Sequence, residues 1–209
     1  MTQTKRLITQ YSIISDQVSK EDLEIILGEL ENVLDSEAPG SIVEFGCYIG
    51  TTSLFIRRLL DAHREMRDFH VYDSFAGLPE KTRQDGSAAG VEFTAGQLAV
   101  SKKQFIREFQ KAGLRLPVVH KGWFNELAPA EVPEHIAFAF LDGDFYESIK
   151  TSLGLVLPRM SPGGTIVVHD YAREALPGVA RAVQEYGLST TVRHGLGVIK
   201  PRGAARNDY

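Results

Sequence analysis

Apolar residues recur at intervals of three and four along residues 20–35, which predicts an amphipathic helix with one buried face. The apolar positions of this segment are Leu23, Ile26, Leu27, Leu30 and Leu34. Four later segments are also predicted to be helical, and they span residues 47–66, 101–113, 145–160 and 178–187. The first of these opens with a glycine-containing turn, and Ser101 and Gly113 are suited to cap the second.

Short runs of nearly continuous apolar residues alternate with these helices, and such runs are typical of strands buried on both faces of a sheet. They span residues 41–46, 69–75, 116–123, 135–144 and 165–171, and a tight turn is expected at 161–164. The alternation predicts an α/β fold, a doubly wound and mostly parallel sheet with helices on both faces. Residues 189–200 are expected to form a terminal pair of strands that adds an antiparallel strand to the sheet.

We expect residues 1–209 to form one domain, because neither an internal repeat nor a linker interrupts this pattern. Residues 1–38 are expected to be a helical extension, about one helix, ahead of the first strand. The segment 76–100 is loop-like and carries four glycines, and a loop of this length is often a lid or disordered. We favour a lid that a bound ligand orders. The polar tail at 201–209 is expected to fray.

Composition narrows the class of protein without identifying its chemistry. The chain has 209 residues, of which 43% are hydrophobic, and its formal net charge of −4 argues against nucleic acids and anionic membranes as partners. Cys47 is the only cysteine, so no disulfide can form within the chain. The first residues lack the apolar core of a signal peptide, and no stretch approaches the ~20 apolar residues that span a bilayer. We therefore expect a cytoplasmic protein.

Acidic residues follow the buried strands at the points where the strands end. Four of them lie at or near the carboxyl ends of predicted strands, namely Glu44, Asp73, Asp142 and Asp170. Ligands of open α/β sheets bind outside these ends, so the four carboxylates are expected to border one crevice. A carboxylate at the edge of a buried strand is costly unless a positive group meets it, which predicts a cationic ligand there.

The turn after the first strand allows a ligand to approach the backbone closely. Gly46 and Gly50 place no side chain in the way, and the start of the following helix offers free N–H groups. Asp73 is placed to accept hydrogen bonds from two ribose hydroxyls. The spacing G-C-Y-I-G differs from the dinucleotide fingerprint G-x-G-x-x-G, so we favour S-adenosylmethionine as the ligand. NAD is the second candidate, and a tight turn without a ligand is the third.

Four segments together resemble the macrocin O-methyltransferase family, namely V-E-F-G-C-Y-I-G-T-T-S at 43–53, V-Y-D-S-F-A-G-L-P-E at 71–80, K-G-W-F-N-E-L-A-P at 121–129, and residues 140–171 with the string D-G-D-F-Y-E-S. The resemblance runs from about Ile42 to Tyr186. It implies a Rossmann-like class I methyltransferase that uses S-adenosylmethionine and a divalent metal, Mg²⁺ or Mn²⁺. The implied acceptor is a hydroxyl of a sugar or other natural-product small molecule in antibiotic biosynthesis. Homo-oligomers are also compatible with the family.

The resemblance implies roles for individual residues, among them Ser74 beside the ribose and Trp123 beside the adenine. The cofactor-binding set that we expect is Glu44, Phe45, Gly46, Gly50, Thr51, Thr52, Asp73, Ser74, Gly122, Trp123 and Asp142. The implied metal ligands are Asp142, His169 and Asp170, and the implied catalytic base is Asp144. A hard cation can lower the pKa of a sugar hydroxyl, and a nearby carboxylate can then take its proton.

His169 departs from the family, in which two aspartates commonly precede the tyrosine. An imidazole is a softer ligand than a carboxylate and suits Mn²⁺, Fe²⁺ or Zn²⁺ better than Mg²⁺. Three interpretations stay open: His169 binds a transition metal, it lies behind the ligands of Mg²⁺, or the metal is lost and His169 is the catalytic base. Asp144 also has a simpler interpretation as the cap of a helix that begins at Phe145, and Trp123 has one as a core aromatic.

Two other classes of function stay open. One is an oxidoreductase on the same fold, either a metal-dependent hydroxylase or an NAD-dependent enzyme, and the other is a non-catalytic protein that binds S-adenosylmethionine. Binding of S-adenosylmethionine in preference to NAD distinguishes the first alternative from a methyltransferase. Methyl transfer to a hydroxyl acceptor distinguishes the second.

Overall fold

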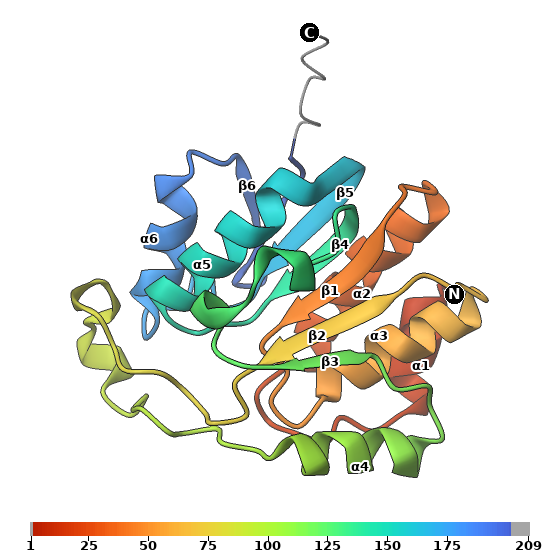
Figure 1. Ribbon diagram of the computed structural model, residues 1–209, viewed down its shortest axis with the longest axis horizontal. Coiled ribbons are helices and arrows are strands. Elements are labelled where there is room, and N and C mark those ends of the chain that lie inside the picture. The colour runs from red at the N-terminus through yellow and green to blue at the C-terminus, as the bar shows by residue number, and fades with distance from the viewer. Residues whose placement is uncertain (1, 202–209) are drawn as a thin grey trace, which may run out of the picture.

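A seven-stranded sheet forms the centre of the computed structural model, which describes residues 2–201 (Figure 1). The strands are β1 (Ser41–Phe45), β2 (Phe69–Asp73), β3 (Val118–Lys121), β4 (Ile136–Leu141), β5 (Met160–Val168), β6 (Thr190–Arg193) and β7 (Leu196–Ile199). Their order is β3-β2-β1-β4-β5-β7-β6. Strands β1 to β5 run parallel, whereas β7 is antiparallel to β5 and β6. The prediction of a mostly parallel sheet with a terminal antiparallel strand is confirmed.

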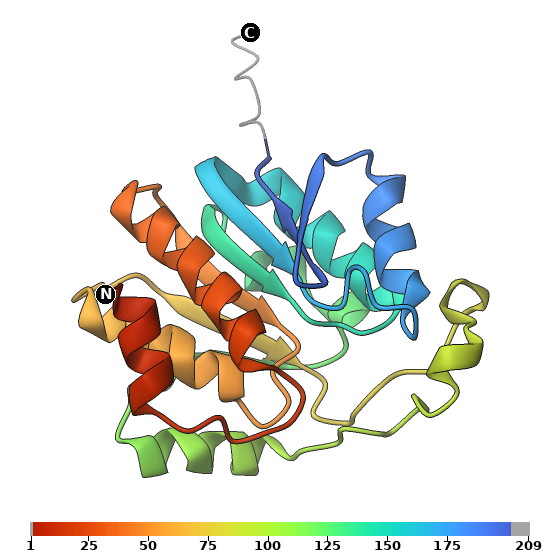
Figure 2. The same ribbon diagram turned by 180° about the vertical axis from the view of Figure 1, so that it is seen from behind.

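Helices cover both faces of this sheet, as the two opposite views show (Figures 1 and 2). One face carries α1 (Gln3–Gln10), α2 (Lys20–Asp35) and α3 (Thr51–Ala62), and the other carries α5 (Tyr146–Val156) and α6 (Pro177–Glu185). Helix α4 (Lys102–Ala112) buries Phe105 and Phe109 in the same apolar core as the first three helices. Two apolar cores therefore enclose the sheet, and the predicted arrangement of helices on both faces is confirmed.

Local sequence sets where two of these helices begin. Helix α2 starts after Ser19, whose hydroxyl accepts a hydrogen bond from the Asp22 N–H (3.0 Å), while the Asp22 carboxylate accepts one from the Ser19 N–H (3.0 Å). This reciprocal capping box fixes the Asp22 side chain at the helix N-terminus. Helix α4 is capped by Ser101 and ends at Gly113 in a left-handed conformation, as predicted.

The largest departure from the predicted elements lies before β5. The turn expected at 161–164 belongs to this strand instead, because Met160 already pairs with Ile136 of β4. Helix α5 ends at Val156, earlier than predicted, because Pro158 has no N–H with which to continue the helical hydrogen bonds. The register with β4 then shifts from Met160 opposite Ile136 to Thr165 opposite Phe138, so residues 161–164, with Gly163 at φ +80°, form an irregularity within the strand.

The segment before β1 and the connection between β2 and α4 contain more structure than was predicted. Two helices, α1 and α2, precede β1 where one was expected. The long connection between β2 and α4 contains short 3-10 turns at Arg83–Asp85 and Ala88–Gly90 and extends beside α6 (Figure 2). Its role as a lid, and the treatment of residues 1–209 as one domain, remain predictions. The predicted tail lies outside the described residues from 202 onward.

The length and the apolar character of the described helices bear on whether any of them could cross a lipid bilayer. Within residues 2–201, none of them is both long enough and apolar enough to span a membrane. The longest, α2, carries several charged residues along its sequence, in keeping with its position against one face of the sheet.

Candidate functional site

A cavity of about 330 Å³ lies at the carboxyl ends of β1, β2, β4 and β5. Much of its wall comes from residues directly after these strands, namely Gly46, Cys47, Tyr48, Asp73, Ser74, Asp142, Gly143, Asp144, Phe145, His169 and Asp170. Residues 77–80 of the long loop and the segment 123–126 contribute to another part of the wall. Three of the four carboxylates expected to border one crevice therefore do so, because parallel strands present their carboxyl ends at one edge.

Asp73 ties two loops of the cavity wall together. Its Oδ2 atom accepts hydrogen bonds from the backbone N–H groups of Cys47 (2.8 Å) and Tyr48 (3.1 Å), and its Oδ1 atom accepts one from Phe75 (2.7 Å). Tyr48 and Phe75 both adopt the left-handed backbone conformation, which a non-glycine residue rarely does. The three bonds therefore fix the orientation of the Asp73 carboxylate at the wall.

Gly46, Ser74 and Trp123 also line the cavity. Gly46 has φ +87°, and a Cβ atom on it would lie 1.9 Å from the carbonyl oxygen of Asp142. Only glycine allows the loops after β1 and β4 to approach this closely. The Ser74 hydroxyl accepts a hydrogen bond from the N–H of Ala76 (3.1 Å), which turns the chain away from the end of β2.

Glu44 does not line the cavity, and this corrects the expectation that it borders the crevice. Its side chain is fully buried between the sheet and α3, where the Ser53 hydroxyl donates a hydrogen bond to Oε2 (2.5 Å) and Oε1 has no hydrogen-bond partner. Burial raises the pKa of Glu44 well above its usual value, and the negative charges of Asp142 and Asp73 add to this effect. A neutral carboxyl group below the cavity wall is the consequence.

The other predicted cofactor residues pack around the cavity and do not line it; they are Phe45, Gly50, Thr51, Thr52 and Gly122. Gly50 faces α4, since a Cβ atom on it would lie 2.9 Å from the ring of Phe105. The Thr51 hydroxyl lies 2.7 Å from that of Ser15. The first turn of α3 therefore contacts the N-terminal segment, because the loop after β1 continues to residue 50 before the helix begins.

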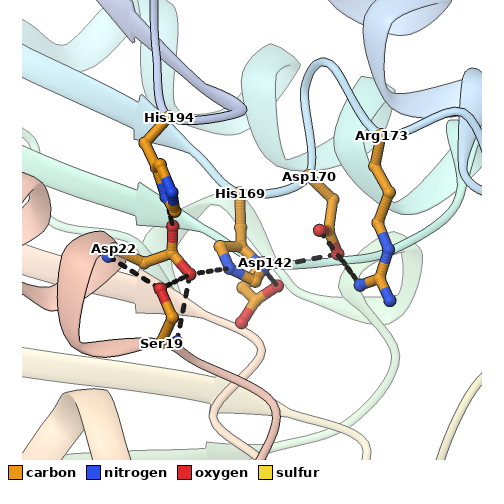
Figure 3. A network of polar contacts seen from close by, with 7 residues as sticks. All are labelled: Ser19, Asp22, Asp142, His169, Asp170, Arg173 and His194. Carbon is orange, nitrogen blue, oxygen red and sulfur yellow. Dashed lines mark hydrogen bonds and ion pairs between the residues drawn. The ribbon is translucent and has the colours of Figure 1, made fainter.

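Asp142, His169 and Asp170 form a compact group at the other part of the wall (Figure 3). One ligand atom from each of them lies within 4.8 Å of the others. The His169 Nδ1 atom is 3.0 Å from Asp142 Oδ1 and 3.4 Å from Asp170 Oδ2. Two carboxylates and one imidazole in this space are a donor set that fits a divalent cation.

Charge dominates this group. Burial lowers the pKa of His169, but the charge of Asp142, the hydrogen bond to it and the nearby carboxylates of Asp170 and Asp22 outweigh this effect and raise that pKa well above the usual value. Burial likewise opposes ionisation of Asp170, but its contacts with His169 and Arg173 lower its pKa. Arg173 Nη1 lies 3.2 and 3.4 Å from the two carboxylate oxygens of Asp170. The group therefore places two carboxyl groups, an imidazole and a guanidinium next to one another in the cavity wall.

Asp144 lies on the wall in a left-handed conformation with φ +58°. Burial raises the pKa of its carboxyl group well above the usual value, and the charges of Asp142 and Asp170 raise it further. A carboxylate with a raised pKa is a stronger base than an ordinary aspartate. Asp144 does not cap α5, because Phe145 occupies the position before the helix, so the simpler interpretation of Asp144 as a cap is wrong.

The cap of α5 comes instead from a residue that sequence reasoning missed. Asp85, in the long loop, accepts a hydrogen bond from the Tyr146 N–H to its Oδ1 atom (2.7 Å). Its Oδ2 atom accepts from the N–H (2.8 Å) and hydroxyl (2.7 Å) of Thr82, and the residue is only 1% exposed. Asp85 therefore joins the long loop to the helix that follows Asp144.

Asp22 and Arg173 were also missed, although both contact the predicted metal ligands. The motif S-x-x-D at 19–22 is a capping signal and could have identified Asp22 as fixed in orientation, but not its contact with His169. Arg173 follows Asp170 by three residues and lies beside the ring of Phe93, 5.1 Å from its centre. A pairing at this spacing needs a turn that the sequence pattern did not indicate.

The sequence matches known proteins over most of its length. Residues 12–205 match the family described as Macrocin-O-methyltransferase (TylF). The chain is 36% identical over 171 residues to an 8-demethyl-8-(2,3-dimethoxy-alpha-L-rhamnosyl)-tetracenomycin-C 4'-O-methyltransferase of Streptomyces olivaceus, covering 78% of this chain and 65% of the relative. It is 34% identical over 172 residues to the demethyldecarbamoylnovobiocin O-methyltransferase of Streptomyces niveus, covering 78% and 64%. The match therefore spans slightly less than two thirds of the length of these relatives.

Solved structures are similar in fold as well. The O-methyltransferase NovP superimposes with a TM-score of 0.77 and 29% identity, covering 88% of this chain and 81% of that one. The calicheamicin methyltransferase CalS11 gives a TM-score of 0.72 at 21% identity, covering 95% and 90%, which shows the shared fold alone. The sheet is therefore of the class I methyltransferase type.

Proposed function

The chain belongs to the macrocin O-methyltransferase family, and we propose that it transfers a methyl group from S-adenosylmethionine to a sugar hydroxyl of a small natural product. One observation carries the proposal: a single cavity is lined both by the side chains of Asp142, Asp144 and Asp170 and by those of Asp73 and Trp123. Donor and acceptor can then meet in one space, and positioning of this kind supplies much of the rate.

We assign the donor to the part of the cavity bordered by Asp73. The fixed Asp73 carboxylate is placed to accept hydrogen bonds from ribose hydroxyls, and Trp123 offers a flat face for an adenine. Gly46 lets the loops after β1 and β4 lie close together beside this part of the cavity. When bound, S-adenosylmethionine supplies a methyl group already activated by its sulfonium charge, which the acidic wall favours.

Asp142, His169 and Asp170 would hold the divalent metal that the family uses. Bound there, the metal would lower the pKa of the acceptor hydroxyl and orient it. Asp144 is assigned as the general base: it accepts the hydroxyl proton while the C–O bond forms and the C–S bond of the donor breaks. Its raised pKa strengthens it for this role, because an ordinary aspartate is a weak base at neutral pH.

The test combines ligand binding with turnover. Trp123 is the only tryptophan in the chain, so its fluorescence should report titration with S-adenosylhomocysteine directly. Methyl transfer is then measured by mass spectrometry on glycosides with free sugar hydroxyls, beginning with the tetracenomycin and novobiocin precursors of the relatives. Binding of NAD without S-adenosylhomocysteine would support an oxidoreductase, and binding without any transfer would support a non-catalytic protein; either would overturn the proposal.

Asp144→Asn tests the base. The change keeps size and removes the proton acceptor, so kcat should fall by about 10²–10⁴-fold while the affinity for S-adenosylhomocysteine stays the same. Asp144 must be ionised to act, so the rate of the wild type should fall at acidic pH. The apparent pKa of this fall should lie above the pKa of ~3.9 of an ordinary aspartate. Glu134→Gln, at an exposed position away from the cavity, is the matched control. Unchanged turnover in the Asp144 variant would remove it from this role.

A further inference from the structure

The two ring nitrogens of His169 face different groups (Figure 3). Nδ1 points to Asp142 and Asp170, at 3.0 and 3.4 Å, whereas Nε2 lies 3.9 Å from the Oδ2 atom of Asp22. The His169 side chain is only 7% exposed, so these carboxylates form much of its polar surroundings. The ring therefore bridges the predicted metal ligands on the sheet and the N-terminus of α2.

Asp22 is itself held from several sides. Its Oδ2 atom accepts hydrogen bonds from the hydroxyl (2.5 Å) and N–H (3.0 Å) of Ser19, and its Oδ1 atom lies 3.1 Å from His194 Nδ1. These contacts fix the orientation of the Asp22 carboxylate at the N-terminus of α2.

We propose, building on the function above, that Asp22 is a positioning residue that accepts the Nε2 proton of His169, so that Nδ1 becomes a ligand of a cation shared with Asp142 and Asp170. A metal-bound histidine usually donates its other N–H to a carboxylate, which selects the tautomer and makes the ligand more basic. Because one ligand is then nitrogen, the site prefers first-row transition-metal cations such as Mn²⁺ or Fe²⁺ over Mg²⁺, which favours oxygen.

The opposite side of the site supports this assignment. Arg173 contacts both carboxylate oxygens of Asp170 and limits the directions in which they can turn. Two of the three ligands thus have a partner that is not itself a ligand: Asp22 for His169 and Arg173 for Asp170. Outer partners of this kind hold the ligands of metal sites in the orientation that binding requires.

The experiment measures cation binding to the full chain in the absence of any methyl donor or acceptor. Free Mn²⁺ is followed by electron paramagnetic resonance, Mg²⁺ is measured by competition, and pulsed resonance detects nitrogen bound to Mn²⁺. Wild-type protein should bind Mn²⁺ at least tenfold more tightly than Mg²⁺ and show a nitrogen coupling. The His169→Asp variant should lose the nitrogen coupling to Mn²⁺, and its preference for Mn²⁺ over Mg²⁺ should be smaller.

Asp22→Asn should weaken Mn²⁺ binding by about 10–100-fold, the usual effect of removing an outer partner. Glu21→Gln is the matched control, because it removes the same charge from the same turn of α2 at an exposed position. Equal Mn²⁺ affinity in these two variants, equal binding of Mg²⁺ and Mn²⁺ by the wild type, or a wild-type signal without nitrogen coupling would overturn the inference. Titration with S-adenosylhomocysteine, done separately, tests the proposed function, so the two can fail independently.

Discussion

At the scale of single residues, the environment of each carboxyl group decides its charge. Burial alone would raise the pKa of Asp22 and of Asp170, but contacts with His169 and Ser19 lower that of Asp22, and contacts with His169 and Arg173 lower that of Asp170. Glu44 and Asp144 have no such dominant partner, and burial raises their pKa. Carboxyl groups of the same chemical type therefore differ in pKa: contacts favour the ionised form in one pair, and burial favours the protonated form in the other.

The raised pKa of Glu44 can be tested through the pH dependence of the free energy of unfolding. Its folded-state pKa is raised, so the folded state holds a proton that the unfolded state releases above about pH 4.3. The stabilisation is complete below that pH and is lost as the pH rises through the raised folded pKa. Glu44→Gln keeps the Ser53 contact without the ionisation, so its free energy of unfolding, relative to wild type, should increase with pH. Urea denaturation of both proteins from pH 4 to pH 9 measures this difference, and a constant difference would contradict it.

At the scale of elements, the site depends on the contacts that the long loop makes with α5 and α6. Asp85 caps α5 from the long loop, and the N-terminus of α6 approaches the same carboxylate. The loop is further attached by the Ser87 hydroxyl, which donates to the Glu174 carbonyl (2.8 Å), and by a contact of Arg181 with the Gln84 carbonyl. The part of the predicted lid near Asp85 is thus already packed, so closure over a ligand would have to come from its other residues.

Gly178→Ala tests the contact of α6 with Asp85 and the start of α5. A Cβ atom at residue 178 would lie 1.9 Å from Asp85 Oδ1 and 2.9 Å from the backbone nitrogen of Tyr146. We expect a loss of roughly 1–3 kcal/mol in the free energy of unfolding, as for other overpacked sites, and lower kcat because α5 follows Asp144.

The control for this change is another glycine-to-alanine substitution within a helix. A Cβ atom on Gly28 in α2 would have no neighbouring atom within 4 Å, so Gly28→Ala should stabilise the protein by up to ~1 kcal/mol. Thermal and urea unfolding of the two variants measure both effects. A Gly178 variant as stable as the Gly28 variant would show that this contact of α6 tolerates a side chain.

At the scale of the whole molecule, the cavity collects its wall from both halves of the sheet. Loops after β1 and β2 form one part, and loops after β4 and β5 form the other. A ligand that spans the cavity therefore connects segments that are far apart in the chain. The proposed binding of donor and acceptor would therefore take place at the one edge where all four strands end.

Ligand binding should consequently stabilise the entire fold. S-adenosylhomocysteine at 100 times its Kd should add about 2.7 kcal/mol to the free energy of unfolding, provided that it binds only the folded chain. Mn²⁺ should raise the Tm as well, and a chelator should reverse only that part. Differential scanning fluorimetry with each ligand alone and with both together measures these shifts, and no shift with either ligand would count against the assigned site.

The sequence alone determined the fold class and the meeting of Asp73, Asp142 and Asp170, because apolar periodicity defines the elements and parallel strands end at one edge. It also determined the helix caps at Ser101 and Gly113, which depend on neighbours in the chain. Only the tertiary structure decided that Glu44 is buried, that Asp85 caps α5 and that Asp22 faces His169. Those contacts join residues far apart in sequence, and they follow from how helices and loops pack on the sheet, which local patterns do not encode.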